Sequence, residues 1–260
     1  MPIREKSGLK YLYFENMENQ RVVQGIFTRH GGVSPAPWAS LNLGGTVGDT
    51  RENVIENRLR IFTLLDREVE SIFDVWQVHG NHVICTDRPR PLDGLHEKAD
   101  AILTDKQEIT LFMRFADCVP VFLFDPVKRV VGMVHAGWQG TVLRICEKTI
   151  KTMQNVYDSD PRDILAGIGP SISSEAYQIG EDVLLRVKES FGEDGEQLIK
   201  RYNGYVHLDL WEANRLTLEQ AGVREIEVVK ICTAQNTNDW YSHRKEKGKT
   251  GRFGALIALN

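Results

Sequence analysis

The sequence of 260 residues lacks any run of about 20 apolar residues, the length that a membrane-spanning helix requires. Its first residues, MPIREKSGLKYLYF, also lack an apolar segment as long as the core of a signal peptide. We therefore expect no membrane partner and predict a cytoplasmic protein.

Cysteine is scarce as well. The four cysteines, Cys85, Cys118, Cys146 and Cys232, are far apart and form no Cys-x-x-Cys pair. Small secreted proteins that depend on disulfides carry cysteine at a much higher density. The sequence therefore predicts reduced thiols, in agreement with a cytoplasmic location.

Positive charge is not concentrated anywhere along the chain. The formal net charge is -4, and the densest basic run, HRKEKGK (243–249), is short and interrupted by Glu246. Domains that bind nucleic acid typically carry a clustered basic surface. We expect no nucleic-acid partner and interpret this run as a solvated loop.

Internal repeats, low-complexity tracts and linkers are also absent. The composition, 42% hydrophobic and 26% charged, is that of an ordinary globular protein. A chain of this length suffices for one large domain or two small ones. Without a linker we predict one domain over residues 1–260. The oligomeric state, monomer or homodimer, stays open.

The sequence does contain many short apolar segments, which predict strands because they are rich in β-branched and aromatic residues and bounded by Gly, Pro, Asn or Asp. They include LKYLYF, VVQGIFT, SIFDVWQV, HVICT, DAILT, ITLFMRF, VFLF, RVVGMVH, DILAGIG, YVHLDL and IEVVKICT. Strands and helices do not alternate strictly, which argues against a doubly wound sheet or a TIM barrel. We predict a single α/β domain of mixed β-sheets flanked by helices in a layered sandwich.

Four segments show the spacing or the end signals of helices. They cover residues 51–65, 141–157, 181–191 and 211–222. Asp49 is the expected N-cap of the first helix. Cys146 falls on the apolar face of the second, which predicts a core residue, and Gly222 is expected to end the fourth.

Reactive side chains stand at the ends of apolar strands in four places, a position typical of active sites. The segments are TRHGGVS (28–34), WQVHGNHV (76–83), FADCVP (115–120) and VGMVHAGWQGT (131–141). In FADCVP an acid and a thiol interrupt two apolar runs, and Pro120 marks a strand end or a bulge because it cannot donate a ladder hydrogen bond.

His79, Cys118 and His135 together supply two imidazoles and one thiolate, the ligands of an open zinc site with a fourth position for water or substrate. Zinc at such a site lowers the pKa of bound water to about 7. The alternative for each residue is a structural role.

Asp117 either orients a ligand histidine or caps backbone N–H groups. The helix expected to begin near Thr141 offers an anion site or is a plain turn.

These segments resemble the laccase-domain family, once called polyphenol oxidase-like and now described as zinc-dependent purine nucleoside phosphorylases. The similar stretches are WQVHG, FADCVP, VHAGWQGT, GIGPSIS and WYSHR, together with TRHGGVS, SLNLGGTVGD and KTGR. They occur in the family's order between about residues 25 and 257. Two departures are Gln139, where the family usually has Arg, and Trp76, where Glu is frequent.

The resemblance implies that His79, Cys118 and His135 are metal ligands and catalytic residues. It implies phosphorolysis of adenosine, inosine and methylthioadenosine, so that the partners are purine nucleosides and phosphate, with adenosine deamination as a second activity. Arg29 is implied as a catalytic and substrate-binding residue, and Arg244 as a further substrate contact. Zinc is the expected cofactor, and copper is compatible with the same ligands.

Three other functions use the same residues. A metal-free hydrolase would employ Cys118 as nucleophile and His135 as its base. A copper phenol oxidase is least favoured, because a multicopper enzyme needs further clustered histidines, often in His-x-His pairs, and the sequence has none. A non-enzymatic protein would hold a structural zinc ion at these residues.

Overall fold

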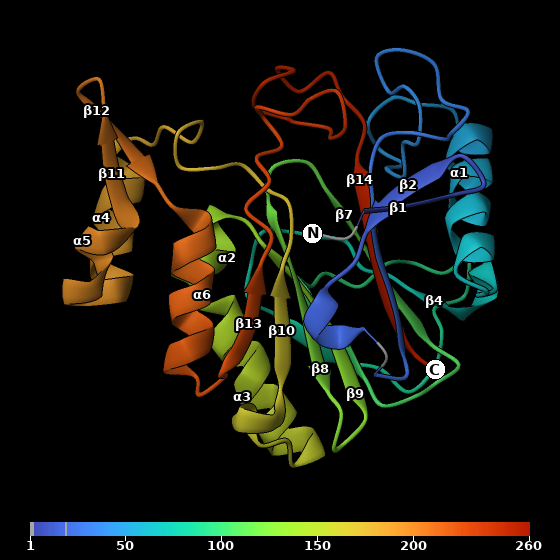
Figure 1. Ribbon diagram of the computed structural model, residues 1–260, viewed down its shortest axis with the longest axis horizontal. Helices are drawn as coiled ribbons and strands as arrows, with labels where there is room; N and C mark the ends of the chain where they lie inside the picture. Colours follow the sequence, from blue (N-terminus) through green and yellow to red (C-terminus); the bar gives the residue numbers. More distant parts are fainter. Residues whose placement is uncertain (1–2, 19) are drawn as a thin grey trace.

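Two six-stranded sheets lie face to face, and helices cover the outer side of each, which gives four layers (Figure 1). The computed structural model describes residues 3–18 and 20–260; residues 1, 2 and 19 of the predicted domain lie outside the described residues. The predicted α/β fold of mixed sheets flanked by helices is confirmed.

The first sheet is antiparallel except at one edge, where β4 runs parallel to β7. Its strands are, in spatial order, β1 (Ile3–Lys6), β2 (Leu9–Leu12), β3 (Val22–Phe27), β14 (Phe253–Leu259), β7 (Thr110–Phe115) and β4 (Ile72–Phe73). The central strand β14 was not predicted, although FGALIAL is wholly buried between β3 and β7.

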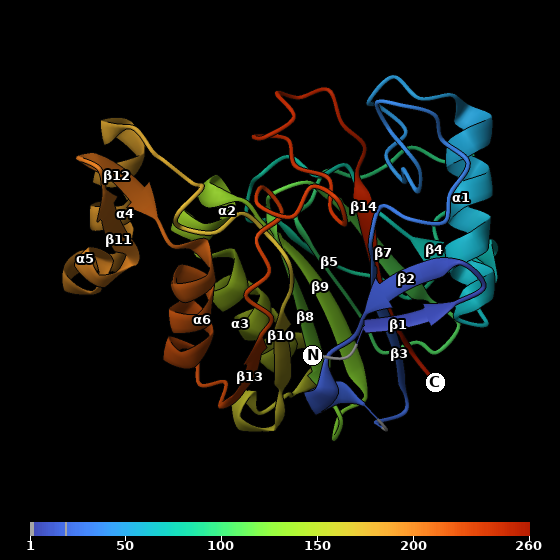
Figure 2. The ribbon, with the colours of Figure 1, turned by 45° about the horizontal axis from the view of Figure 1, so that its top comes forward.

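The second sheet is also mixed, with parallel pairs at both edges. Its strands are, in spatial order, β13 (Glu225–Val228), β10 (Leu165–Ile168), β8 (Val119–Asp125), β9 (Val130–Ala136), β6 (Ala101–Thr104) and β5 (Val83–Cys85). A separate hairpin, β11 (Ile199–Tyr202) and β12 (Tyr205–Leu208), lies with α4 and α5 beyond α6 (Figure 2).

Helix α1 covers the first sheet, and the remaining α-helices lie on the side of the second (Figure 1). The helices are α1 (Arg51–Leu64), α2 (Trp138–Val142), α3 (Ile145–Tyr157), α4 (Glu181–Phe191), α5 (Gly195–Leu198) and α6 (Leu210–Gln220). Short 3-10 helices are η1 (Glu15–Met17), η2 (Val69–Ser71), η3 (Pro161–Asp163) and η4 (Gly192–Asp194).

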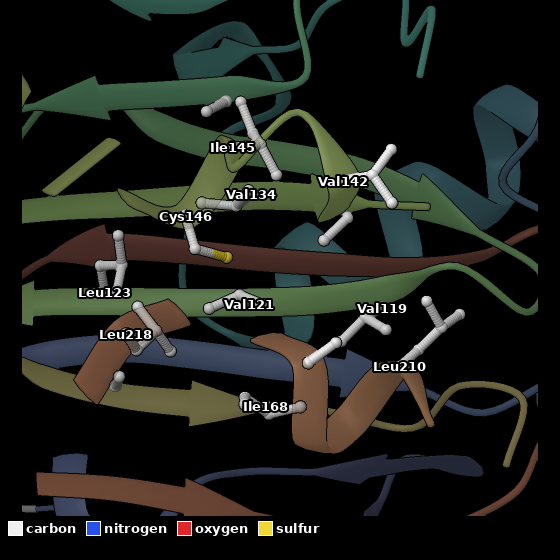
Figure 3. Packing of buried hydrophobic residues seen from close by; sticks show 14 of the residues in the cluster. Val119, Val121, Leu123, Val134, Val142, Ile145, Cys146, Ile168, Leu210 and Leu218 are labelled. Carbon is white, nitrogen blue, oxygen red and sulfur yellow. The ribbon is translucent and has the colours of Figure 1, made fainter. Parts of the chain in front are cut away.

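Three apolar clusters fill the spaces between the four layers, and alternate residues of one strand face different clusters. In β8, Val119, Val121 and Leu123 face α3 and α6 (Figure 3). Cys146 of α3 belongs to the same cluster, as predicted for a core residue. Phe122 and Phe124 of the same strand face the other sheet. A third cluster joins α1 to the outer face of the first sheet.

The structure corrects three predicted element boundaries. Thr50, not Asp49, is the N-cap of α1, and its side chain accepts a hydrogen bond from the N–H of Asn53. The predicted helix 141–157 is two helices, because Arg144 adopts a left-handed conformation with φ 59° between them. In SIFDVWQV only β4 is a strand, since the buried Asp74 binds side chains instead of a ladder.

Gly222 ends α6 as predicted. Its φ is +99°, and its N–H donates to the carbonyl of Glu219 while Val223 donates to that of Leu218. These two bonds form the Schellman motif that favours glycine at the position after a helix.

Candidate metal and active site

The stretch FADCVP is the point where the chain passes from one sheet to the other. Strand β7 ends at Phe115 in the first sheet, and β8 begins at Val119 in the second. Asp117 lies in this crossing with a φ of +84°, an unusual conformation for a residue with a side chain. Pro120 is the second residue of β8, which agrees with a strand end. The crossing presents Cys118 at the gap between the sheets.

Asp117 holds this crossing in place. Its Oδ1 accepts a hydrogen bond from the Thr233 hydroxyl at 2.7 Å, and its Oδ2 accepts one from the N–H of Arg244 at 2.6 Å. Of the two roles considered for Asp117, the structure supports the capping of backbone N–H groups. Its carboxylate makes no hydrogen bond to a ligand histidine among the residues described.

His135 is delivered by β9, which pairs with β8 so that His135 lies opposite Pro120. Its side chain is buried, and its Nδ1 lies 2.8 Å from Oδ1 of Asp100. This hydrogen bond fixes the ring and leaves Nε2 for another partner, the arrangement found for many metal-ligating histidines.

His79 lies on the loop after β4 with a φ of 62°. Asp100 holds this loop too, because its carboxylate accepts hydrogen bonds from the N–H groups of Val78, His79 and Gly80 at 3.2, 2.9 and 2.7 Å. One buried carboxylate therefore positions two of the three candidate ligands.

The three predicted ligands come together. Ligand atoms of His79, Cys118 and His135 all lie within 4.8 Å of one another, and the two imidazole rings meet edge to face at a centroid distance of 4.9 Å. Tetrahedral bonds of 2.0–2.3 Å separate neighbouring ligands by roughly 3.3–3.7 Å. The donor set is that of an open zinc site, and separations of at most 4.8 Å bring the three side chains near the spacing that one ion requires.

Gly137 makes room for this group. A Cβ atom at this position would lie 2.9 Å from Cδ2 of His79 and 3.0 Å from Sγ of Cys118. At such distances a side chain would force His79 or Cys118 to shift. The glycine of HAGW therefore permits the close packing of these two residues.

Electrostatics favour a thiolate at this position. Burial raises the pKa of Cys118, but the imidazoles of His135 and His79 outweigh it and lower the pKa to about 6. Burial lowers the pKa of His135, whereas Cys118 and Asp100 raise it to about 9. A thiolate beside positive charge is the form of cysteine that binds metals and acts as a nucleophile.

The three candidate ligands line a cavity of about 640 Å³. Its lining contains four arginines and a single carboxylate, that of Asp117; the arginines are Arg58, Arg114, Arg244 and Arg252. Such a wall suits a substrate that carries negative charge.

The two predicted substrate-binding arginines lie in different environments. Arg244 lines the cavity, where its guanidinium stacks over Tyr177 at 4.9 Å. Arg29 does not line it, because its guanidinium donates to the carbonyls of Ala39 and Thr237 and pairs with Glu246. The structure brings Arg244 to the site and leaves Arg29 in the packing beside it.

Sequence reasoning missed Asp100, Arg58 and Arg114. Asp100 directly precedes the apolar strand β6, where a buried acid signals a positioned polar group. Arg58 occupies an i, i+4, i+7 position with Val54 and Ile61, where an apolar residue would be expected. A charge on the buried face of an amphipathic helix is the signal that identifies it.

The predicted anion site at a helix start near Thr141 is not supported. Helix α2 begins earlier, at Trp138, and has only five residues. Gln139, at the position where the resemblance expects Arg, is exposed.

No helix in the described part of the chain has the length and apolar character to cross a membrane.

Known proteins are similar over nearly the whole chain. A protein named purine nucleoside phosphorylase YlmD from Bacillus subtilis is 36% identical over 252 residues, which cover 94% of this chain and 91% of the relative. A purine nucleoside phosphorylase of Deinococcus radiodurans is 39% identical over 241 residues, with coverages of 93% and 90%.

Solved structures share the fold. The crystal structure of YlmD from Geobacillus stearothermophilus matches with a TM-score of 0.92 and 32% identity, covering 99% of this chain and 98% of that one. The hypothetical protein YfiH of Bacillus licheniformis gives the same TM-score and identity over 100% and 99%. With a family model that matches residues 23–260, these similarities confirm the resemblance: the chain belongs to the family described as multi-copper polyphenol oxidoreductase laccase.

Proposed function

We propose that this protein is a zinc-dependent purine nucleoside phosphorylase that acts on adenosine, inosine and methylthioadenosine and also deaminates adenosine. The curated relatives that are named purine nucleoside phosphorylase support the reaction class. The observation that carries the proposal is the open group of two imidazoles and one thiolate in the wall of a cavity large enough for a nucleoside.

His79, Cys118 and His135 would hold the metal ion, which supplies Lewis acidity to the bound substrates. The chain's own contribution is to fix these donors: Asp100 orients His135 and the His79 loop, and Gly137 lets the ligands approach. In phosphorolysis the phosphate attacks C1′ of the ribose while the base departs, so that the remaining requirement is alignment of the two substrates.

Aromatic residues of the cavity wall suit the purine. Trp76, Trp138 and Tyr177 line the cavity and present flat apolar surfaces on which a base can stack. Arg244, stacked on Tyr177, offers N–H donors beside that surface. Arg29 does not line the cavity, and its Nε and Nη1 donate to backbone carbonyls and to Glu246; its role as a catalytic and substrate-binding residue stays a prediction.

The Cys–His hydrolase is the second candidate, because the thiolate of Cys118 beside His135 is also the pair that such an enzyme needs. The copper phenol oxidase has less support. Within residues 3–18 and 20–260, His79, Cys118 and His135 form the single group of three or more potential ligands, and a multicopper enzyme requires another. A structural zinc site would leave the arginine-rich cavity unexplained.

A product assay tests the proposal. We expect adenosine with phosphate to give adenine and ribose 1-phosphate, and adenosine alone to give inosine slowly. Both activities should disappear when a chelator removes the metal and return when zinc is restored. Full activity in metal-free protein would refute the zinc-dependent reaction and favour the hydrolase; phenol oxidation in proportion to bound copper would favour the oxidase.

A further inference from the structure

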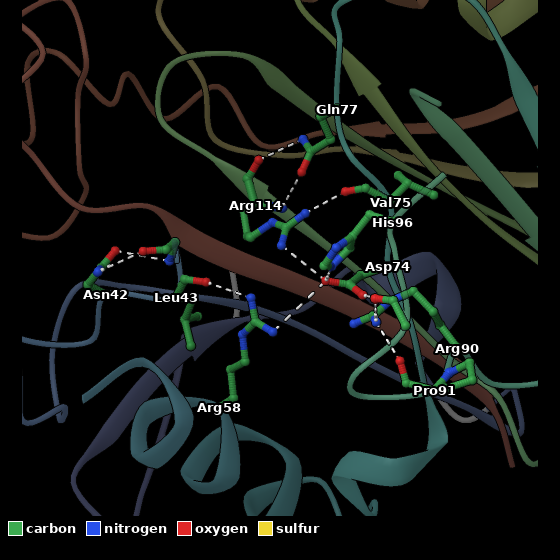
Figure 4. Close-up of polar contacts among 12 residues, drawn as sticks. Asn42, Leu43, Arg58, Asp74, Val75, Gln77, Arg90, Pro91, His96 and Arg114 are labelled. Atoms are coloured by element: carbon green, nitrogen blue, oxygen red, sulfur yellow. Dashed lines mark hydrogen bonds and ion pairs between the residues drawn. The ribbon is translucent and has the colours of Figure 1, made fainter. Parts of the chain in front are cut away.

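A cluster of charged side chains at the cavity wall is separate from the candidate metal ligands. Asp74 is fully buried, and three arginines and one histidine surround its carboxylate (Figure 4). They are Arg58, Arg90, Arg114 and His96. Arg58, Arg114 and His96 also line the cavity. Three guanidinium groups against one carboxylate leave an excess of positive charge at the cavity wall.

The hydrogen bonds of Asp74 are taken mainly by Arg90, Arg114 and His96. Oδ1 accepts from Nε of Arg90 at 2.7 Å. Oδ2 accepts from Arg114 at 3.0 Å and lies 3.1 Å from Nε2 of His96. Three of the roughly four acceptor positions of the carboxylate are therefore occupied before Arg58 is considered.

Arg58 is the cation that remains undercompensated. Its guanidinium lies 4.0 Å from Oδ2 of Asp74 and makes one long hydrogen bond of 3.3 Å, to the carbonyl of Leu43. Its buried Nε has no hydrogen-bond partner among the described residues. Burial and the neighbouring Arg114 lower its pKa to about 10, which reflects a cation that lacks sufficient negative charge nearby.

The cluster also lies within reach of the metal ligands. Arg114 is four residues before Cys118, and Asp74 is five residues before His79. Extended segments of this length span at most about 14–18 Å. Gln77 joins the two segments, because its side-chain amide bonds both the N–H and the carbonyl of Arg114. Members of both groups line the same cavity, so that substrates bound there face the arginines and the candidate metal ligands together.

We propose that Arg58 and Arg114, with His96 beside them, bind the orthophosphate that attacks the nucleoside. Guanidinium groups match phosphate oxygens through paired N–H donors, and they keep their charge over the physiological pH range. This inference rests on the proposed phosphorylase function and assigns the second substrate to a place in the cavity. It also gives the buried Asp74 a role, as the carboxylate that orients Arg114 and His96.

Binding of inorganic phosphate alone, measured by equilibrium dialysis of the zinc-loaded protein, tests the site. We expect Arg58→Gln to weaken phosphate binding about 10- to 100-fold, the effect of losing charge-assisted hydrogen bonds. The KM for phosphate should rise by a similar factor, whereas the KM for inosine and the zinc content should stay unchanged. Arg60→Gln is the matched control: it lies on the same helix but pairs with Glu56 and donates to the carbonyl of Gly31.

Unchanged phosphate binding in folded Arg58→Gln would overturn the proposal. So would Arg58-dependent binding of inosine 5′-monophosphate combined with no binding of inorganic phosphate. If Arg58→Gln does not fold, Arg58→Lys decides, because it keeps the charge but loses the paired donors: weaker phosphate binding is expected, and wild-type binding would contradict the site.

Failure of the proposed function gives a different result. A wild-type protein that binds phosphate through Arg58 but shows no phosphorolysis would refute the phosphorylase and leave the anion site standing. Phosphorolysis with a phosphate KM that is independent of Arg58 would leave the enzyme standing and refute the site.

Discussion

Two groups of side chains contribute to one cavity but differ in chemistry. The first is the candidate metal-ligand group, and the second is the arginine cluster, which is the set of Arg58, Arg90, Arg114 and His96 around Asp74. His79, Cys118 and His135 offer electron pairs, and Asp100 holds the ring of His135 and the loop that carries His79 through four hydrogen bonds. The arginine cluster offers N–H donors and has more positive charge than Asp74 balances. The first group suits a cation and the second an anion, so the two regions teach that one cavity is arranged for two ligands of opposite charge.

The largest effect on activity is expected from a change in the candidate metal-ligand group. Cys118→Ala removes the thiolate, so zinc affinity and base release should fall more than about 100-fold, since even residues that only orient a ligand account for 10- to 100-fold. Metal analysis and a product assay measure the loss. Phosphate binding at Arg58 should persist, and its disappearance would show that the two groups are not independent.

The next largest effect is expected on stability, from the buried carboxylate of the arginine cluster. Burial raises the pKa of Asp74, but the hydrogen bond from His96 and the charges of Arg114 and Arg58 hold it well below its usual range. Because the folded pKa is below the unfolded one, the stabilisation is present above about pH 4 and is lost as the pH falls through the folded pKa.

Asp74→Asn should therefore lower the free energy of unfolding by about 3 kcal/mol at pH 7, as expected for a buried ion pair that loses one partner. Urea unfolding should show a smaller difference between variant and wild type at pH 3. Asp160→Asn, which removes an exposed carboxylate paired with Arg162, is the control and should change little at either pH. An equal loss for Asp74→Asn at both values would contradict the ionised state.

Asp100→Asn should weaken zinc binding by the candidate metal-ligand group. The new NH₂ group is a donor and would face N–H groups that now donate to the carboxylate. His135 and the His79 loop would therefore lose their orientation. Zinc affinity should fall about 10- to 100-fold. Asp105→Asn, at an exposed pair with Lys106, is the control. Wild-type zinc affinity in folded Asp100→Asn would remove Asp100 from the site.

The smallest effect is expected from the glycine that packs against His79 and Cys118. Gly137→Ala places a Cβ against His79 and Cys118 and should lower zinc affinity about 10-fold, because the ligands must shift. Gly45→Ala is the matched control, since its Cβ would meet no atom within 4 Å. Both variants should keep their phosphate affinity. Equal zinc affinity in the two would show that the packing around Gly137 is not limiting.

Local patterns were sufficient for most of the fold. Short apolar runs rich in β-branched and aromatic residues predicted β8 and its neighbours, and the glycine signal at Gly222 was correct, because both depend on adjacent residues. The break at Arg144 and the short strand at SIFDVWQV were not predicted. In each, a tertiary requirement overrides a continuous apolar pattern.

The sequence by itself placed Cys118 and His135 at strand ends, and its motifs identified them with His79 as one group. The predicted strand end at His79 was wrong, because His79 lies on the loop after β4. The tertiary structure decided which charged residues join them. Arg58 and Arg114 are separated along the chain, and they meet at the cavity because two sheets and α1 converge there, while Asp100 lies buried behind His79 and His135. Arg29 and Asp117 were named from their motifs. Hydrogen bonds to distant residues show that Asp117 holds the surrounding chain, whereas the predicted role of Arg29 stays a prediction. Local sequence specifies where a side chain stands on its strand, whereas its partner is fixed by packing between distant segments.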